Sequence, residues 1–227
     1  MRIALLLTLL ALSPIATASA QDYQDGQLWV QTVATGQISK NWRTHLELQP
    51  RVFDNARELG MTLIRGAVGR QVAPGVTLWG GYAFVARSLG PQTRWEQRTW
   101  QQASLVLPRA GAWSPSARIR LEQRRLDQWA DTSHRLRLLA RAQHPLGTNT
   151  PWHLAFSNET FVSLDTTTPG PARGYDRNRA FSGVGRRLSS ALTAEAGYMW
   201  ENSTIKGPGQ RNEHIALFVL NAAWPRR

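Results

Sequence analysis

Hydrophobic and polar residues alternate with a period of two along most of the chain. The clearest segment is Trp42 to Phe53, WRTHLELQPRVF. One of its faces carries Trp42, Thr44, Leu46, Leu48, Pro50 and Val52, and the other carries Arg43, His45, Glu47, Gln49 and Arg51. Successive side chains of a β-strand point to opposite faces, whereas a helix would mix these two sets. The pattern therefore predicts strands, and no segment beyond residue 20 has a convincing helical pattern.

Ten further segments show the same alternation with varying clarity. They are 27–36, 61–72, 76–86, 94–107, 117–126, 132–144, 152–164, 175–188, 191–203 and 213–224. Many of them are longer than the usual strand of a soluble sheet and match the length that crosses a bilayer at a tilt. Short turns such as APG alternate with longer polar connections such as DTTTPGPARGYD. This pattern predicts an all-β fold, a transmembrane up-and-down antiparallel β-barrel of about ten to twelve strands.

The number of strands presents a conflict. Single-chain bacterial barrels of this class have an even number of strands. The eleven segments instead place the start of the first segment and the end of the last segment at opposite ends of the barrel, as an odd number of strands would. A strand before Gln27, or one segment that does not span, would restore an even number, and we favour twelve strands. A soluble barrel or sandwich would also alternate, but the lumen of so many strands is too wide for apolar side chains to fill.

The first twenty residues predict an export leader. Arg2 precedes an apolar run that is too short to span a bilayer, and Ala18-Ser19-Ala20 fits the small residues that signal peptidase requires. We therefore expect cleavage before Gln21, one barrel domain over residues 21–227 and an outer-membrane location. A buried N-terminal helix is the alternative. The rest of the chain has no stretch of 18 apolar residues, which argues against a helical membrane protein.

Composition adds two features to this picture. The chain has 27 basic and 15 acidic residues, a net charge of +12, and all but Lys40 and Lys206 of the basic residues are arginines. Arginine is preferred where planar, bidentate pairing with carboxylates or phosphates is needed. Aromatic residues near strand ends predict two interfacial girdles. The girdle candidates are Trp29, Trp42, Trp79, Tyr82, Trp95, Trp100, Trp129, Trp152, Tyr198, Trp200 and Trp224.

The polar faces of the strands carry the candidate functional residues, which we expect to line the lumen. They are Arg43, Glu47, Arg94, Glu96, Arg98, Arg118, Arg120, Glu122, Arg124, Arg135, Arg137, Arg141 and Glu159. Glu122 is expected to pair with arginines of the strands on both sides. Arginines outnumber glutamates in this set, so the lumen is predicted to be positive and to favour small anionic solutes. The alternative is a lumen that its own ion pairs close.

Other classes of function receive less support. His153 and Ser157 share one strand face and suggest an outer-membrane lipid hydrolase or acyltransferase, but four residues of strand separate them by roughly 13 Å. The histidines have no metal-ligand spacing, and we predict no cofactor, no metal and no catalytic residues. His134 and His144 lie in a lipid-facing row. Outer-membrane lipid is the expected surrounding, nucleic acid is not an expected partner, and the sequence does not indicate an oligomeric state.

Four stretches of the chain resemble a known family. They are QLWVQTVATGQISKNW (27–42), WEQRTWQQ (95–102), RLEQRRL (120–126) and YDRNRAFSGVG (175–185). In this order they are similar to the exported bacterial proteins grouped as domain of unknown function 2490, and the likeness covers Gln27 to Ala222. The resemblance implies an outer-membrane β-barrel. It implies no activity and no catalytic residues.

Overall fold

The computed structural model describes residues 23–127, 131–167, 172–204 and 210–224, and these residues form eleven β-strands. The strands are β1 (Tyr23–Gln37), β2 (Trp42–Phe53), β3 (Glu58–Ala73), β4 (Val76–Leu89), β5 (Gln92–Val106), β6 (Ser114–Leu126), β7 (Thr132–Pro145), β8 (Trp152–Ser163), β9 (Gly174–Arg187), β10 (Leu192–Thr204) and β11 (Gln210–Trp224). No helix within these residues is long and apolar enough to cross a membrane. The expected leader, residues 1–20, lies outside the described residues.

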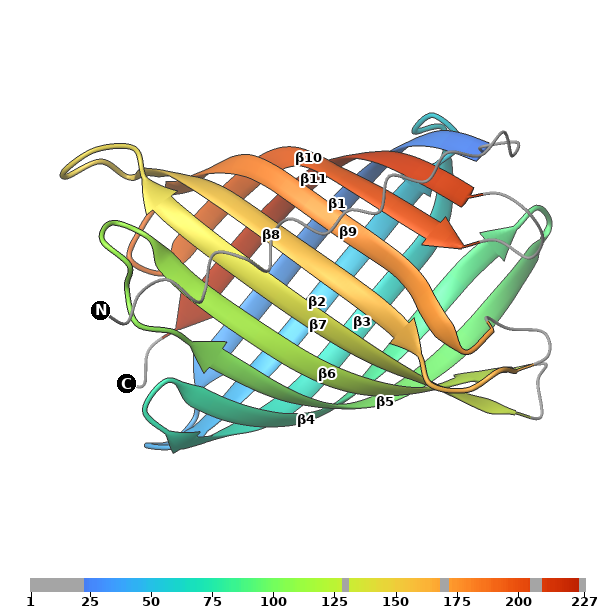
Figure 1. Cartoon of the computed structure of the whole chain (residues 1–227), viewed down its shortest axis with the longest axis horizontal. Helices are drawn as coiled ribbons and strands as arrows, with labels where there is room; N and C mark the ends of the chain where they lie inside the picture. The colour runs from blue at the N-terminus through green and yellow to red at the C-terminus, as the bar shows by residue number, and fades with distance from the viewer. Residues whose placement is uncertain (1–22, 128–130, 168–171, 205–209, 225–227) are drawn as a thin grey trace.

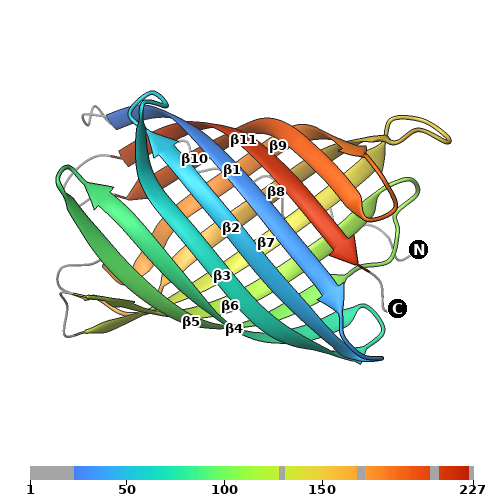
Figure 2. The same ribbon diagram turned by 180° about the vertical axis from the view of Figure 1, so that it is seen from behind.

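The strands form a single closed barrel in which each is hydrogen-bonded to its neighbours in sequence (Figure 1). All consecutive pairs are antiparallel, which confirms the predicted up-and-down barrel. The exception is the closing pair, because β1 runs parallel to β11 from Tyr23↔Arg211 to Gly36↔Trp224. Figure 2 shows these two strands side by side and pointing in the same direction.

The expected number of twelve strands is wrong for the described part of the chain. Among the residues that the structure describes, no separate strand precedes Gln27, because the first strand itself begins at Tyr23. An odd number of strands can close because the first and last strands pair in parallel. The even-number rule assumes that the closing pair is antiparallel. The two ends of the barrel are named here after the strand ends that lie there, the Tyr23 end and the Trp224 end.

The connections differ less in length than the sequence pattern predicts, because several strands extend beyond the expected segments. Residues 38–41, 74–75, 107–113, 146–151 and 188–191 connect strands at the Trp224 end. Residues 54–57, 90–91, 127–131, 164–173 and 205–209 do so at the Tyr23 end. Only the connection 164–173 stands out as long. The predicted contrast between a short-turn end and a long-loop end is therefore wrong.

The two faces of each strand differ as the alternation predicts. On β2, Glu47, Gln49 and Arg51 are buried inside the barrel, whereas Leu46 (58% exposed) and Leu48 point outward. The outer surface exposes large apolar residues from most strands, among them Ile64, Ile119 and Phe218. The barrel thus encloses many charged residues together with apolar clusters such as Met61, Leu63 and Val85, and it exposes large apolar residues on its outer surface.

The outer surface has exposed aromatic residues near both ends of the barrel. Trp42, Trp152 and Trp224 lie at the Trp224 end, and Tyr23, Trp95 and Tyr175 lie at the Tyr23 end. Three predicted girdle residues are instead inside. Trp29 and Trp100 are buried, and Trp79 packs edge-on against His45 on the inward face of β2. Each of these three tryptophans lies on the inward face of its strand, and the wide lumen has room for the three rings. Trp129 lies outside the described residues.

Strands β9 and β10 approach each other closely at one pair of glycines. Gly183 and Gly197 are register partners. A Cβ atom built on Gly197 would lie 2.2 Å from the Ser182 carbonyl oxygen, 2.5 Å from the Gly183 Cα and 2.8 Å from the Phe181 ring. The Phe181 ring therefore occupies the space that side chains at these positions would fill. The wall at this point requires glycine.

Candidate functional site

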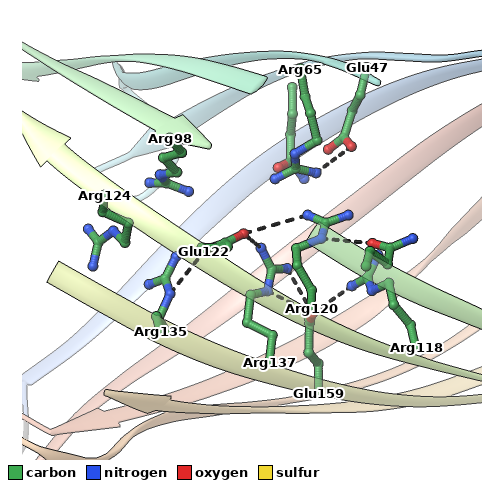
Figure 3. Close-up of polar contacts among 12 residues, drawn as sticks. Glu47, Arg65, Arg98, Arg118, Arg120, Glu122, Arg124, Arg135, Arg137 and Glu159 are labelled. Carbon is green, nitrogen blue, oxygen red and sulfur yellow. Dashed lines mark hydrogen bonds and ion pairs between the residues drawn. The ribbon is translucent and has the colours of Figure 1, made fainter. Parts of the chain in front are cut away.

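An ion-pair belt crosses the middle of the lumen. It consists of Glu47, Arg65, Arg118, Arg120, Glu122, Arg135, Arg137 and Glu159 (Figure 3). These side chains come from β2, β3, β6, β7 and β8. The two-residue repeat of each strand directs them to the same side of the wall. The belt joins charges that are far apart in the sequence but meet inside the closed barrel.

Glu122 is the best-paired carboxylate of the belt and is 0% exposed. It accepts hydrogen bonds from Arg135 Nη2 at 2.7 Å and Arg137 Nη1 at 2.6 Å, and Arg120 Nη1 lies 3.6 Å away. Of the two strands that flank β6, only β7 thus provides arginine partners for Glu122. The expected pairing with β5 is wrong, because Arg98 there binds Glu96 of its own strand through Nε and Nη2.

The remaining belt residues form one further group of ion pairs around Glu159 and a separate pair on the far side of the lumen. Glu159 binds Arg118 Nη2 at 2.5 Å and Arg137 Nη2 at 2.8 Å. Glu47 binds Arg65 Nη1, also at 2.5 Å. In Figure 3 the Glu47–Arg65 pair lies across the lumen from Glu122 and Glu159. Each carboxylate therefore has at least one guanidinium partner, as buried charges require.

Aromatic rings fill the space between the guanidinium groups. The Arg120 guanidinium lies 4.2 Å from the centre of the Trp100 ring, and that of Arg51 lies 3.6 Å from the Trp29 ring. Such contacts are favourable when water is excluded. An open channel would leave the residues along its wall exposed, yet Trp29, Trp100, Arg120 and Glu122 are all buried. The middle of the lumen is therefore closed by side chains in this structure.

The other predicted lumen residues lie nearer the two mouths of the barrel. Arg124 joins Arg98 on Glu96, with its Nε 2.5 Å from the carboxylate. Arg141 binds Glu195 at 2.5 Å. Arg43, near the Trp224 end, donates instead to the Gln71 side chain at 2.9 Å. The Arg94 Nε is buried without a hydrogen-bond partner among the described residues. The predicted set thus forms several separate contacts besides the belt.

A small cavity of about 30 Å³ lies between the belt and the Tyr23 end, and nine of its eleven lining residues are arginines. We call it the arginine cavity. Its arginines are Arg51, Arg65, Arg87, Arg98, Arg124, Arg135, Arg137, Arg177 and Arg179, and Met61 and Phe161 complete it. No carboxylate is among the described residues that line it. All the charged side chains that line the cavity are therefore positive.

Five arginines of the cavity were not among the predicted site residues, namely Arg51, Arg65, Arg87, Arg177 and Arg179. Arg51 lies on the predicted polar face of its strand, but the alternation alone does not distinguish it from the other polar residues there. Arg65 lies on an inward face that is otherwise mostly apolar, with Met61 and Leu63. The spacing of Arg177 and Arg179 by two residues was a usable signal. The pairing of β8 with β9 has a β-bulge between Phe161 and Val162, which shifts the register near the start of β9. This shift interrupts the alternation there and makes the spacing harder to recognise.

The histidines have ordinary structural contacts. His153 Nε2 lies 3.3 Å from Glu195, and no serine hydroxyl is hydrogen-bonded to a histidine within the described residues. The same part of the chain contains no cluster of three potential metal ligands. His134 contacts Asp165 in the connection after β8. Slight burial raises the pKa of Asp165, but the His134 backbone N–H at 3.0 Å and ring Nδ1 at 2.6 Å bring it below its usual value.

Comparison with known proteins gives two matches. The sequence profile of a family described as "Protein of unknown function (DUF2490)" matches residues 26–212. An uncharacterized protein of Methylorubrum extorquens strain AM1 is 32% identical over 218 residues, which are 95% of each chain. Neither description gives an activity.

Proposed function

We propose that this chain, which belongs to the DUF2490 family of proteins of unknown function, is an outer-membrane β-barrel. Its positive lumen would provide a narrow path for small anions. The proposal has two parts. The first is that the barrel wall crosses a membrane, and the second is that the lumen selects for negative charge. Each part depends on different residues and can be tested separately.

The outer surface of the barrel supports the membrane part. Its strands have 12 to 16 residues, which is enough to cross a hydrocarbon core at a tilt. Apolar side chains point outward between the two groups of exposed aromatic residues, the arrangement found in transmembrane barrels. A closed barrel also leaves no unpaired strand edge in the lipid. The export leader predicted for residues 1–20 would deliver the chain to the outer membrane.

We expect Ile64→Arg to destabilise the barrel in lipid vesicles by about 2–4 kcal/mol, the usual effect of an arginine near the middle of a bilayer. Ile64 points outward near the middle of β3 and is 56% exposed. The matched control is Ile38→Arg, since Ile38 is 57% exposed but lies in the turn between β1 and β2. Urea unfolding of both variants gives the free energies. Equal effects of the two substitutions would contradict a membrane-embedded wall.

The arginine cavity carries the second part of the proposal. Nine guanidinium groups surround it, so the lumen near the Tyr23 end attracts anions and repels cations. An anion that enters there next meets the ion-pair belt, where side chains close the lumen. Passage requires the belt to separate, because all of its residues except Arg118 are buried in this structure. The proposed path is therefore narrow, anion-selective and mostly closed.

Planar-bilayer recordings of the purified barrel test this path. We expect brief, small current steps whose reversal potential in a KCl gradient indicates preference for chloride over potassium. Glu47 and Arg65 form an ion pair with no net charge. Removing both side chains from the belt should widen the path and raise the conductance a few-fold. The double variant Glu47→Ala/Arg65→Ala makes this change, and the selectivity should persist because the other arginines remain.

The control for this experiment removes an ion pair at the Tyr23 end. Arg211 and Glu213 lie at the start of β11, with Nε and Oε1 2.6 Å apart, and Arg211 is partly exposed. The double variant Arg211→Ala/Glu213→Ala should conduct like the wild type. A folded protein that leaves the membrane sealed in both the wild type and the belt variant would refute the anion path and favour a closed structural barrel.

A further inference from the structure

We propose that the arginine cavity is a binding site for one tetrahedral oxyanion of the size of phosphate or sulfate. The inference deepens the anion path proposed above, since it names the class of anion and the place where it is held. It rests on the balance of charge around the cavity, on two arginines without a carboxylate partner, and on the size of the space.

The charges around the cavity do not balance. Seven of its nine arginines contact six carboxylates, those of Glu47, Glu96, Glu122, Glu159, Asp176 and Glu201. Two of these carboxylates are also shared with Arg118 and Arg120 of the belt. Buried positive charge without a counter-charge is costly. An anion in the cavity would offset the surplus from its centre, at a point that no acidic side chain reaches.

Arg51 is the clearest unpaired member of the cavity. It is 8% exposed, and no carboxylate of the described residues lies within ion-pair distance of it. Its Nε and Nη2 donate to the Gln49 side chain at 3.2 and 2.7 Å, and its flat face stacks on Trp29. These contacts hold the guanidinium in place and leave its other N–H groups without an anionic acceptor. Arg51 is thus positioned for a ligand oxygen.

Two further arginines have donors available for a ligand. Arg65 Nε is buried and lacks a hydrogen-bond partner within the described part of the chain. Arg87 lies near the end of β4, is exposed and has no ion-pair partner among the described residues. Since Arg87 is open to solvent while the belt closes the opposite side, we infer that the anion enters from the Tyr23 end.

The size of the cavity limits the ligand. A volume of about 30 Å³ corresponds to the space of one or two water molecules. Phosphate and sulfate, with four oxygens around one central atom, are larger than this, so the surrounding guanidinium groups would have to move apart to hold one of them; a sugar or nucleotide is far too large. Guanidinium groups bind such oxyanions through paired N–H···O bonds. Several converging arginines favour a doubly charged anion over chloride.

The test measures phosphate binding to the refolded barrel in detergent by isothermal titration calorimetry. Sodium phosphate or sulfate should bind with a stoichiometry of one, and sodium chloride at equal ionic strength should not. Arg51→Gln should weaken phosphate binding about tenfold or more, the usual effect of losing a hydrogen bond to a charged group. It breaks no ion pair, so the barrel should still fold. Arg87→Gln, at an exposed position, provides a second variant with the same expected direction.

The matched control is Arg43→Gln. Arg43 lies on the same strand and face as Arg51 and also donates to a glutamine, but it is near the Trp224 end and does not line the cavity. It should leave phosphate binding unchanged. Equal weakening by Arg43→Gln, or equal responses to phosphate and chloride, would overturn the site, because both indicate general charge screening.

Two further comparisons define the ligand and separate this inference from the conduction path. Glycerol 3-phosphate and a short-chain phosphatidic acid represent phosphate esters and lipid headgroups. If either bound as tightly as inorganic phosphate, the enclosed oxyanion site would be refuted, since the cavity has no room for glycerol. Phosphate binding that is lost in Arg51→Gln, together with a sealed bilayer, would support this site while refuting conduction. Anion-selective current without phosphate binding would support conduction and refute the oxyanion site.

Discussion

Glu122→Gln is expected to lower the free energy of unfolding by about 3–5 kcal/mol, the usual result of removing one partner from a buried ion-pair network. Glutamine has nearly the same shape, so the change leaves no cavity and acts through charge. Arg135 and Arg137 would lose the carboxylate that accepts their hydrogen bonds at 2.7 and 2.6 Å. The belt, in which five arginines already face three glutamates, would then hold five arginines and only two glutamates among largely buried side chains.

Urea unfolding of the refolded protein measures this effect. The control is Glu58→Gln at the exposed start of β3, which should change stability by less than about 0.5 kcal/mol. The double variant Glu122→Gln/Arg135→Gln should recover part of the loss, because it removes one of the arginines left without a partner. A single Glu122→Gln variant as stable as the control would show that the belt contributes nothing to the fold.

Gly197→Val is expected to cost at least about 3 kcal/mol or to prevent folding, the upper end of the effects of overpacking. The new Cβ would meet backbone atoms of β9, the Ser182 carbonyl oxygen and the Gly183 Cα, neither of which can move without separating the strands. The Phe181 ring would also have to leave its place over the two glycines. Because the clash is with main-chain atoms, side-chain rotation cannot relieve it.

The neighbouring residue provides the control for this prediction. Ala196 lies on the same strand but faces outward and is exposed, so Ala196→Val should change stability little. Migration on a gel without heating distinguishes folded from unfolded barrels, and urea unfolding then gives the difference in free energy. Similar stability of the two variants would contradict the close approach of β9 and β10.

The local architecture of this barrel follows from its sequence to a large extent. The period of two correctly separates Leu46 from Glu47 and Ile119 from Arg120, because each choice depends only on adjacent residues in a strand. The girdle prediction is wrong for Trp29 and Trp100, because it depends on residue type and not on the strand face. Both tryptophans share that face with buried polar residues, so the same period, applied consistently, would have placed them in the lumen.

The closure of the barrel and the arginine cavity could not be predicted in the same way. The pairing of Tyr23 with Arg211 joins residues from the two ends of the chain, and no local pattern specifies it. The cavity combines side chains of eight strands, β2 to β9, so it depends on barrel diameter, register and the β-bulge near the start of β9. Arg65 shows the difficulty, since its role depends on residues of distant strands and little in its own segment indicates it.

The parallel pairing of β1 with β11 also bears on how the chain folds. Every other pair of strands can form as a hairpin from residues close in sequence, whereas this pair joins positions about 190 residues apart, a contact of very high order. Closing such a long loop carries a large entropic cost that is recovered only when both strands are in place. We expect the edges of β1 and β11 to be the last to pair, so the unfinished barrel would expose these two edges to any strand able to add to them.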